Sequence, residues 1–241
     1  MRRFACAWFL CLWPGLAAAQ APPAPPPLRE GTVDFSFVST TGNSSTQSVG
    51  LSADVIFRPD SWEIRNRAAF VRAESDDTVS AQAFAYQFKA ARKVTSRLSA
   101  YGQYDYLRDT FAGVDHRNGV LGGADYLLLG RERQSLKVFG GLGYANERRI
   151  TGDDVSTGVL DTGWAYKLKF SATAEFTDDL RYGASFYASK DWRLGHVAAV
   201  TARLTQLLSL KVSHTTRYSN FPPPGFEKTD TITAVALVAK F

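Results

Sequence analysis

The chain has 241 residues, of which 45% are hydrophobic and 21% charged, and its formal net charge is +5. Setting aside Arg2 and Arg3 of the N-terminal segment leaves 26 basic residues against 23 acidic ones, a surplus too small to predict a nucleic-acid partner. Beyond that segment, no apolar run reaches the roughly 20 residues that a membrane-spanning helix needs.

Residues 1–19 are predicted to be a secretory signal peptide. Met1-Arg2-Arg3 is basic, an apolar stretch follows, and small residues offer cleavage after Ala19 or as late as Ala21. Both cysteines, Cys6 and Cys11, lie in this segment. The exported chain would therefore have no thiol for a disulfide, a metal or a nucleophile, and no cofactor is predicted.

Residues 20–31 are predicted to be a periplasmic tether. The stretch from Ala21 to Leu28 reads Ala-Pro-Pro-Ala-Pro-Pro-Pro-Leu. Proline lacks the amide hydrogen that a sheet ladder requires, so this stretch is expected to stay extended ahead of the first strand.

From residue 32 to residue 241 the chain divides into segments of about 10 to 16 residues in which apolar side chains alternate with polar or small ones. In Val49–Phe57, for example, the odd positions are apolar, whereas Gly50, Ser52 and Asp54 alternate with them. No helical period persists. Repetition of this pattern predicts an all-β fold, an antiparallel transmembrane β-barrel of the bacterial outer membrane. A soluble periplasmic β-protein is the alternative, because a half-buried sheet alternates in the same way.

Turn-forming residues set the strand count. Short connections are predicted at 58–61, 93–96, 130–133, 169–172 and 205–206, and longer ones at 41–45, 74–77, 109–114, 149–155, 184–189 and 220–227. Short and long connections tend to alternate, as in outer-membrane barrels with short periplasmic turns. About twelve strands are predicted, with both chain ends in the periplasm. The unclear stretch 169–191 leaves ten strands as the alternative.

The alternation also predicts a lumen in which charges of both signs are interleaved. The inward residues are Asp54, Glu63, Arg65, Arg67, Lys89, Asp105, Arg117, Asp125, Lys137, Asp161, Lys167, Glu175, Arg181, Arg193, Arg203, Lys211 and Arg217. About twelve strands lie between a packed barrel of eight and an open channel of sixteen. Two hypotheses follow: a structural scaffold whose charges neutralise one another, and a narrow pore with a basic bias.

The three histidines allow a test for lipid chemistry. Lipid-directed outer-membrane hydrolases use a His and a Ser two residues apart on a lipid-facing strand, because alternate residues point the same way. None of His116, His196 and His214 has a serine two positions later, and His214-Thr215-Thr216 is a near miss. We therefore predict no enzyme, catalytic residue or metal ligand, with a lipid hydrolase centred on His214 as the alternative.

The segment Tyr101–Tyr126 is more specific than generic barrel sequence. It runs from an aromatic-rich strand through Arg108-Asp-Thr-Phe-Ala-Gly-Val-Asp-His-Arg117 into a glycine-rich strand. This pattern resembles the hairpin of the family catalogued as domain of unknown function 481, also described as salt-induced outer-membrane proteins. Thr40–Ser44 and Lys228–Phe241 are similar to that family's first external turn and closing strand. The resemblance implies an outer-membrane barrel with no established activity and a link to salt or envelope stress.

Four charged residues of the hairpin form a candidate site. Arg108, Asp109, Asp115 and Arg117 are expected to lie close together across its two arms and to form ion pairs that hold the loop, with ligand contact as a second role.

The closing strand is expected to pair with the strand that starts near Thr32 and to place Phe241 on the lipid face. Phe241 is predicted to be displayed to the barrel-assembly machinery, as in similar outer-membrane proteins. Outer-membrane lipid and lipopolysaccharide are the other expected partners, and the oligomeric state is left open.

Overall fold

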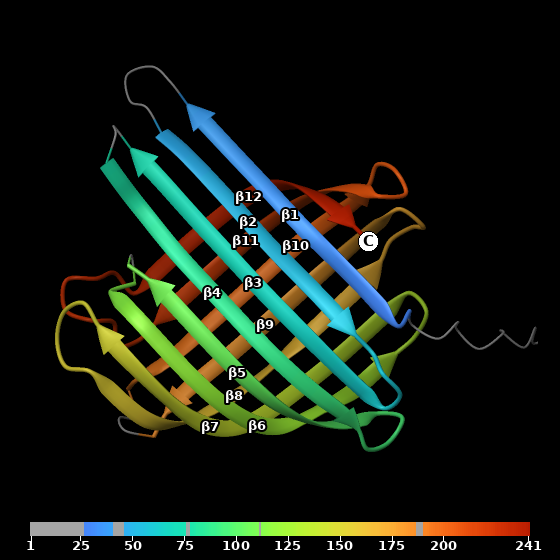
Figure 1. Cartoon of the computed structure of the whole chain (residues 1–241), viewed down its shortest axis with the longest axis horizontal. Helices are drawn as coiled ribbons and strands as arrows, with labels where there is room; N and C mark the ends of the chain where they lie inside the picture. Colours follow the sequence, from blue (N-terminus) through green and yellow to red (C-terminus); the bar gives the residue numbers. More distant parts are fainter. Residues whose placement is uncertain (1–26, 41–45, 76–77, 111, 187–189) are drawn as a thin grey trace, which may run out of the picture.

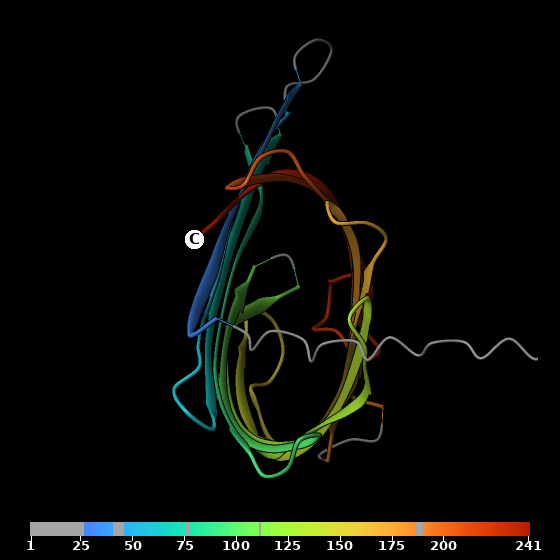
Figure 2. The same ribbon diagram turned by 90° about the vertical axis from the view of Figure 1, so that its right-hand side faces the viewer.

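The computed structural model describes residues 27–40, 46–75, 78–110, 112–186 and 190–241. Within these residues, twelve strands form one closed antiparallel barrel in which β1 pairs with β12 (Figure 1). Figure 2 shows the ring as a flattened oval. The predicted twelve-stranded barrel is confirmed, and the ten-strand alternative is wrong. No helix in the described part of the chain is long and apolar enough to cross a membrane.

The strands are long and follow one another around the ring. They are β1 (Arg29–Thr40), β2 (Thr46–Phe57), β3 (Trp62–Ser75), β4 (Thr78–Lys93), β5 (Leu98–Asp109), β6 (Val114–Gly130), β7 (Gln134–Arg149), β8 (Val155–Lys169), β9 (Ala174–Ser185), β10 (Trp192–Arg203), β11 (Leu208–Ser219) and β12 (Thr229–Lys240).

The stretch that was unclear from sequence forms the end of β8 and all of β9. Asp179 and Arg181 face the lumen, whereas Phe176, Leu180 and Tyr182 face outward. The pattern was hard to recognise because Asp178, an outward position, is also charged. Residues 1–26, which include the predicted signal peptide and most of the tether, lie outside the described residues.

β1 begins at Arg29, inside the predicted tether. The Arg58 guanidinium fixes the start of β1 against the β2–β3 turn. It donates a hydrogen bond to the Glu30 carboxylate at 2.7 Å and another to the Pro27 carbonyl at 3.2 Å. Gly31 and Phe241 exchange backbone hydrogen bonds of 2.9 and 3.0 Å. The two ends of the barrel chain therefore meet at one point.

The two ends of the barrel differ. Both the start of β1 and the end of β12 lie beside the connections 58–61, 94–97, 131–133, 170–173 and 204–207, and this end is called the turn end. The opposite end, called the loop end, carries the connections from β5 to β6, β7 to β8, β9 to β10 and β11 to β12.

The seam between β1 and β12 covers less of its strands than the other pairings. Its described pairs run from Thr32 with Lys240 to Phe35 with Leu237. Beyond Phe35, β1 continues to Thr40 paired with β2 alone. Behind β12, Lys211 Nζ of β11 donates to Asp34 of β1 at 2.6 Å. The seam is thus closed at the turn end, and an ion pair bridges it from inside near its last pair.

Glycines in β6 and β7 make room for one aromatic ring on the inner wall. A Cβ atom added to Gly123 or Gly141 would lie 2.7 or 2.5 Å from the Tyr101 hydroxyl oxygen. The ring of Tyr101 lies against these glycines, and Lys89 Nζ sits 3.8 Å from its centroid. Glycine is therefore needed at these two positions because the Tyr101 side chain lies directly against the backbone.

Cysteine cross-linking tests where the seam ends. With Cys6 and Cys11 changed to alanine, Phe35→Cys with Leu237→Cys should form a disulfide, because paired strand positions have Cα atoms within disulfide range. Ser36→Cys with Ala236→Cys is the next register pair and should form little disulfide. Equal yields for the two pairs would show that the seam continues past Phe35.

Candidate functional site: the charged lumen

Ion pairs connect opposite walls of the barrel through the lumen. Arg181 of β9 donates to Asp105 of β5 at 2.5 Å and to Asp161 of β8 at 2.6 Å. Gln87 and Gln103 also donate to Asp105. We call Asp105, Asp161 and Arg181 the aspartate cluster, and it carries one surplus negative charge.

A second cluster lies nearer the loop end. Glu147 of β7, only 3% exposed, accepts hydrogen bonds from Arg149 at 2.8 Å and from Arg193 of β10 at 2.9 Å. The Arg193 Nη1 atom lies 2.6 Å from the same carboxylate, and that of Arg117 lies 3.6 Å from it. We call these four residues the arginine cluster. Its three guanidinium groups share the Glu147 carboxylate, and Asp191 lies 4.0 Å from Arg193.

The predicted lumen charges lie on the inner face. Among them are Glu63, Arg65 and Arg67 on β3, Lys89 on β4, Asp105 on β5, Asp125 on β6, Asp161 on β8, and Lys211 and Arg217 on β11. Lys89 pairs with Asp125 at 2.7 Å. Both Arg65 and Arg67 donate to Asp54. Most of the inner charges are therefore neutralised by a neighbour.

The hairpin residues have partners outside the predicted set. Asp109 pairs with Arg217 at 2.8 Å, Asp115 lies 3.3 Å from His116, and Arg117 belongs to the arginine cluster. Arg108 is exposed on the outer face. A register shift between Leu107 and Asp109 and the alternation of the strand send these side chains to different faces. In place of the ion pairs expected within the hairpin, Asp109 and Arg117 pair with residues of other strands, and Asp115 contacts His116 of its own strand.

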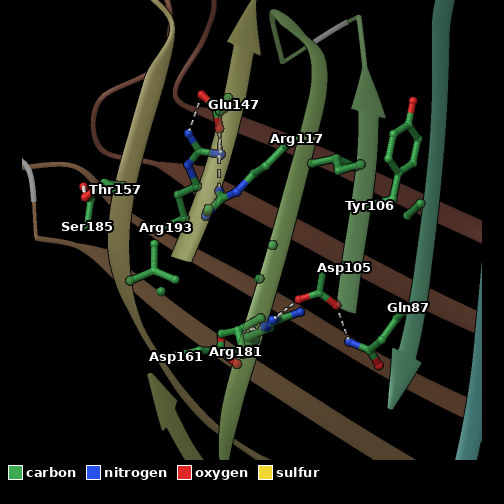
Figure 3. Close-up of a pocket in the computed structure, with 18 of the residues that line it drawn as sticks. Gln87, Asp105, Tyr106, Arg117, Glu147, Thr157, Asp161, Arg181, Ser185 and Arg193 are labelled. Atoms are coloured by element: carbon green, nitrogen blue, oxygen red, sulfur yellow. Dashed lines mark hydrogen bonds and ion pairs between the residues drawn. The ribbon is translucent and has the colours of Figure 1, made fainter. Parts of the chain in front are cut away.

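Two cavities occupy the lumen. The first has a volume of about 360 Å³ and is lined by residues of both clusters (Figure 3). The second, about 500 Å³, lies at the turn end and is lined by five cationic and two acidic residues. These are Arg133, Lys167, Lys169, Arg203, Lys240, Glu132 and Glu175.

The connection between β11 and β12, residues 220–228, folds across the loop end (Figure 2). Thr151 donates to the Pro224 carbonyl at 2.7 Å. Gly113 and Gly152 have positive φ angles, and a Cβ atom on either would lie 2.6 Å from the Phe226 ring or 3.1 Å from Pro224. These glycines let the loops after β5 and β7 receive the 220–228 loop, which narrows this mouth of the barrel.

Sequence reasoning did not include Glu147 or Arg149 among the inward residues. Arg149 was assigned to a loop, although the alternation from Lys137 continues through both positions of β7. The alternating pattern therefore covered both residues, but β7 extends closer to the loop end than the predicted turn at 149–155 indicated.

Comparison with known proteins identifies the family to which the chain belongs. A model of the family described as Protein of unknown function, DUF481, matches residues 33–241. The chain belongs to the DUF481 family. A search of curated proteins found no match.

Solved structures show the fold of this DUF481 barrel. The COG4313 outer membrane channel from Pseudomonas putida F1 has a TM-score of 0.52 at 11% identity, covering 88% of this chain and 95% of that one. The NanC porin has a TM-score of 0.50 at 7% identity, covering 87% of this chain and 97% of that one. Such low identities show that this DUF481 protein shares the fold of outer-membrane β-barrels, and nothing finer.

The outer face of this DUF481 barrel carries an unexpected contact between a histidine and an aspartate. His196 Nε2 of β10 lies 2.7 Å from Asp178 of β9, and Trp164 Nε1 donates to the same carboxylate at 2.8 Å. His214 also faces outward, with Nε2 3.4 Å from the Thr216 hydroxyl and Nδ1 2.8 Å from that of Thr233. Among the described residues, no group of three His, Cys, Asp or Glu side chains is placed to hold a metal ion.

Removing one partner of the outer pair should destabilise the DUF481 barrel more than removing both. His196→Leu leaves Asp178 charged against lipid and should lower the free energy of unfolding by about 2 kcal/mol. Asp178→Leu with His196→Leu should cost less, because no unpaired charge remains. Urea unfolding in lipid vesicles measures both.

The neutral outer pair of Tyr104 and Asn118, 2.7 Å apart, supplies the control. Asn118→Leu should cost about 1 kcal/mol, the value of an ordinary hydrogen bond. A double variant at 178 and 196 that is less stable than His196→Leu would contradict the expected charge effect.

Proposed function

We propose that this protein is a narrow, low-conductance outer-membrane channel without enzymatic activity, exported by the signal peptide of residues 1–19. The observation that supports this role best is the pair of cavities, about 360 and 500 Å³, at successive levels of a charged lumen. A purely structural barrel of this size could fill its interior with apolar side chains, as smaller barrels do.

The ion pairs between the walls support a small conductance. Arg181 reaches from β9 to Asp105 of β5, and Arg217 reaches from β11 to Asp109 of β5. These side chains occupy the centre of the oval and leave a restricted path beside them. The 220–228 loop narrows the loop end further.

The turn-end cavity supports a preference for anions among permeating ions. Five of its seven charged lining residues are cationic. A mouth lined with one sign of charge raises the local concentration of the opposite ion. We propose that this mouth faces the periplasm, that Phe241 is recognised during assembly, and that the outer face contacts lipid and lipopolysaccharide. A role in salt or envelope stress is proposed from the family resemblance alone.

The non-enzymatic assignment is supported by the histidines. His214 has hydroxyl partners on both ring nitrogens, whereas the histidines that contact a carboxylate are His116 and His196. A hydrolytic triad needs acid, base and nucleophile in one chain of contacts.

Planar-bilayer recording of refolded protein tests the channel. Small conductance steps are expected, and replacing residues 222–226 by a Gly-Ser linker should raise the conductance roughly two-fold, because this loop crosses the mouth. Arg72→Gln, which changes an outer-face arginine paired with Glu74, is the control and should leave the steps unchanged. A flat trace from both the unmodified protein and the loop variant would exclude a channel and leave the structural scaffold.

A further inference from the structure

The loop-end cavity is electrically polarised. Its residues include Arg117, Arg193 and Glu147 of the arginine cluster and Asp105, Asp161 and Arg181 of the aspartate cluster. Figure 3 shows the two clusters as separate groups along the cavity. Asp191 also lines the cavity, and with Asp191 the arginine cluster carries a surplus of one positive charge, whereas the aspartate cluster carries a surplus of one negative charge. Arg67 lines the cavity as well, near Asp105, and donates to Asp54.

The positive end has spare hydrogen-bond donors. Arg117 approaches Glu147 at 3.6 Å and donates no hydrogen bond within the part of the chain that the structure describes. Behind the lining, the Arg149 side chain is 5% exposed, and its Nη2 atom is buried without a partner among the described residues. Glu147 already accepts from Arg149 and Arg193. A buried, unsatisfied guanidinium donor is costly unless an anionic group can satisfy it.

The negative end has one carboxylate with a spare acceptor oxygen. Asp105 accepts from Gln87 and Gln103 as well as from Arg181, whereas Asp161 accepts from Arg181 alone among the described residues and is only 4% exposed. Between the ends the wall is made of small or apolar residues such as Gly119, Leu121 and Ala145. The cavity thus offers an anion site and a cation site with an uncharged stretch of wall between them.

We propose that this cavity binds a small zwitterion, with its carboxylate toward Arg117 and its cationic nitrogen toward Asp105 and Asp161. A volume of about 360 Å³ is at the lower end of ligand pockets, which suits a molecule the size of an amino acid or a trimethylammonium carboxylate. A solute with only one charge would satisfy one cluster and be repelled by the other. The inference rests on the proposed channel only for the route by which the solute reaches the cavity.

Three probes of nearly equal shape test the charge requirement. Glycine betaine carries both charges, 3,3-dimethylbutanoate carries the carboxylate alone, and choline carries the cation alone. Calorimetric titration of the refolded full-length protein should show betaine binding about tenfold or more tightly than either of the others, a difference of about 1.4 kcal/mol. Equal binding of betaine and dimethylbutanoate would reduce the cavity to a simple anion site, and no binding of betaine would overturn the proposal.

Substitutions at each end locate the site. Arg117→Gln should weaken betaine binding about tenfold, because it removes the donor nearest the cavity. Asp161→Asn keeps the shape of the negative end but removes its surplus charge, so the preference for betaine over dimethylbutanoate should disappear. Arg72→Gln, on the outer face, should leave both affinities unchanged. Unchanged betaine binding in Arg117→Gln and Asp161→Asn would place the site elsewhere.

The channel and the zwitterion site can be rejected independently of each other. A flat bilayer trace with selective betaine binding would reject the channel and keep the zwitterion site. Conductance steps without selective binding would keep the channel and reject the site. If Arg117→Gln does not fold, Arg117→Lys keeps the charge and removes the planar fork, and an unaltered betaine affinity in it would argue against guanidinium recognition.

Discussion

An ionised side chain on the inner face of a closed sheet can be neutralised by solvent in the lumen or by another charged side chain. In this barrel the second solution dominates, and Arg181 shows it most clearly. From β9 it reaches Asp161 on the adjacent strand and Asp105 on the opposite wall. The oval cross-section brings these walls within reach of one arginine (Figure 2).

The same constraint explains the placement of the other elements. Because the walls are joined through charges, the lumen holds separated cavities rather than one wide pore. The seam of β1 with β12, which has few paired residues, carries its own inner ion pair between Asp34 and Lys211. The 220–228 loop completes the arrangement at the loop end by contact with Thr151 and Gly152.

The alternation of the sequence was sufficient to predict the barrel, the strand count and the inward position of residues such as Lys89 and Asp125. It could not predict partners across the ring, because these depend on the stagger of the strands and on the oval section, which no local pattern encodes. The hairpin acids illustrate this: Asp109 is near Arg108 in sequence but pairs with Arg217, over a hundred positions away. The start of β1 was also missed, since Arg58 holds it through Glu30 from a distant turn.

Two departures from simple alternation are informative about function. Asp178 and His196 place a polar pair on the face that should be apolar, and inside the barrel Arg117 of the arginine cluster donates no hydrogen bond among the described residues. Both cost stability unless a neighbour compensates them. In the outer pair Trp164 and the contact between the two side chains provide the compensation. Inside, the compensation is expected from a bound solute, which is why the cavity is the better candidate for function.

If ion pairs across the lumen hold the two walls together, Asp105 and Arg181 should be energetically coupled in a double-mutant cycle. Asp105→Asn, Arg181→Gln and the double variant would be compared by free energy of unfolding in lipid vesicles. A coupling energy of about 1 kcal/mol or more is predicted, as for close charge pairs in a common network. Additive effects of the two substitutions would show that this pair does not join the walls.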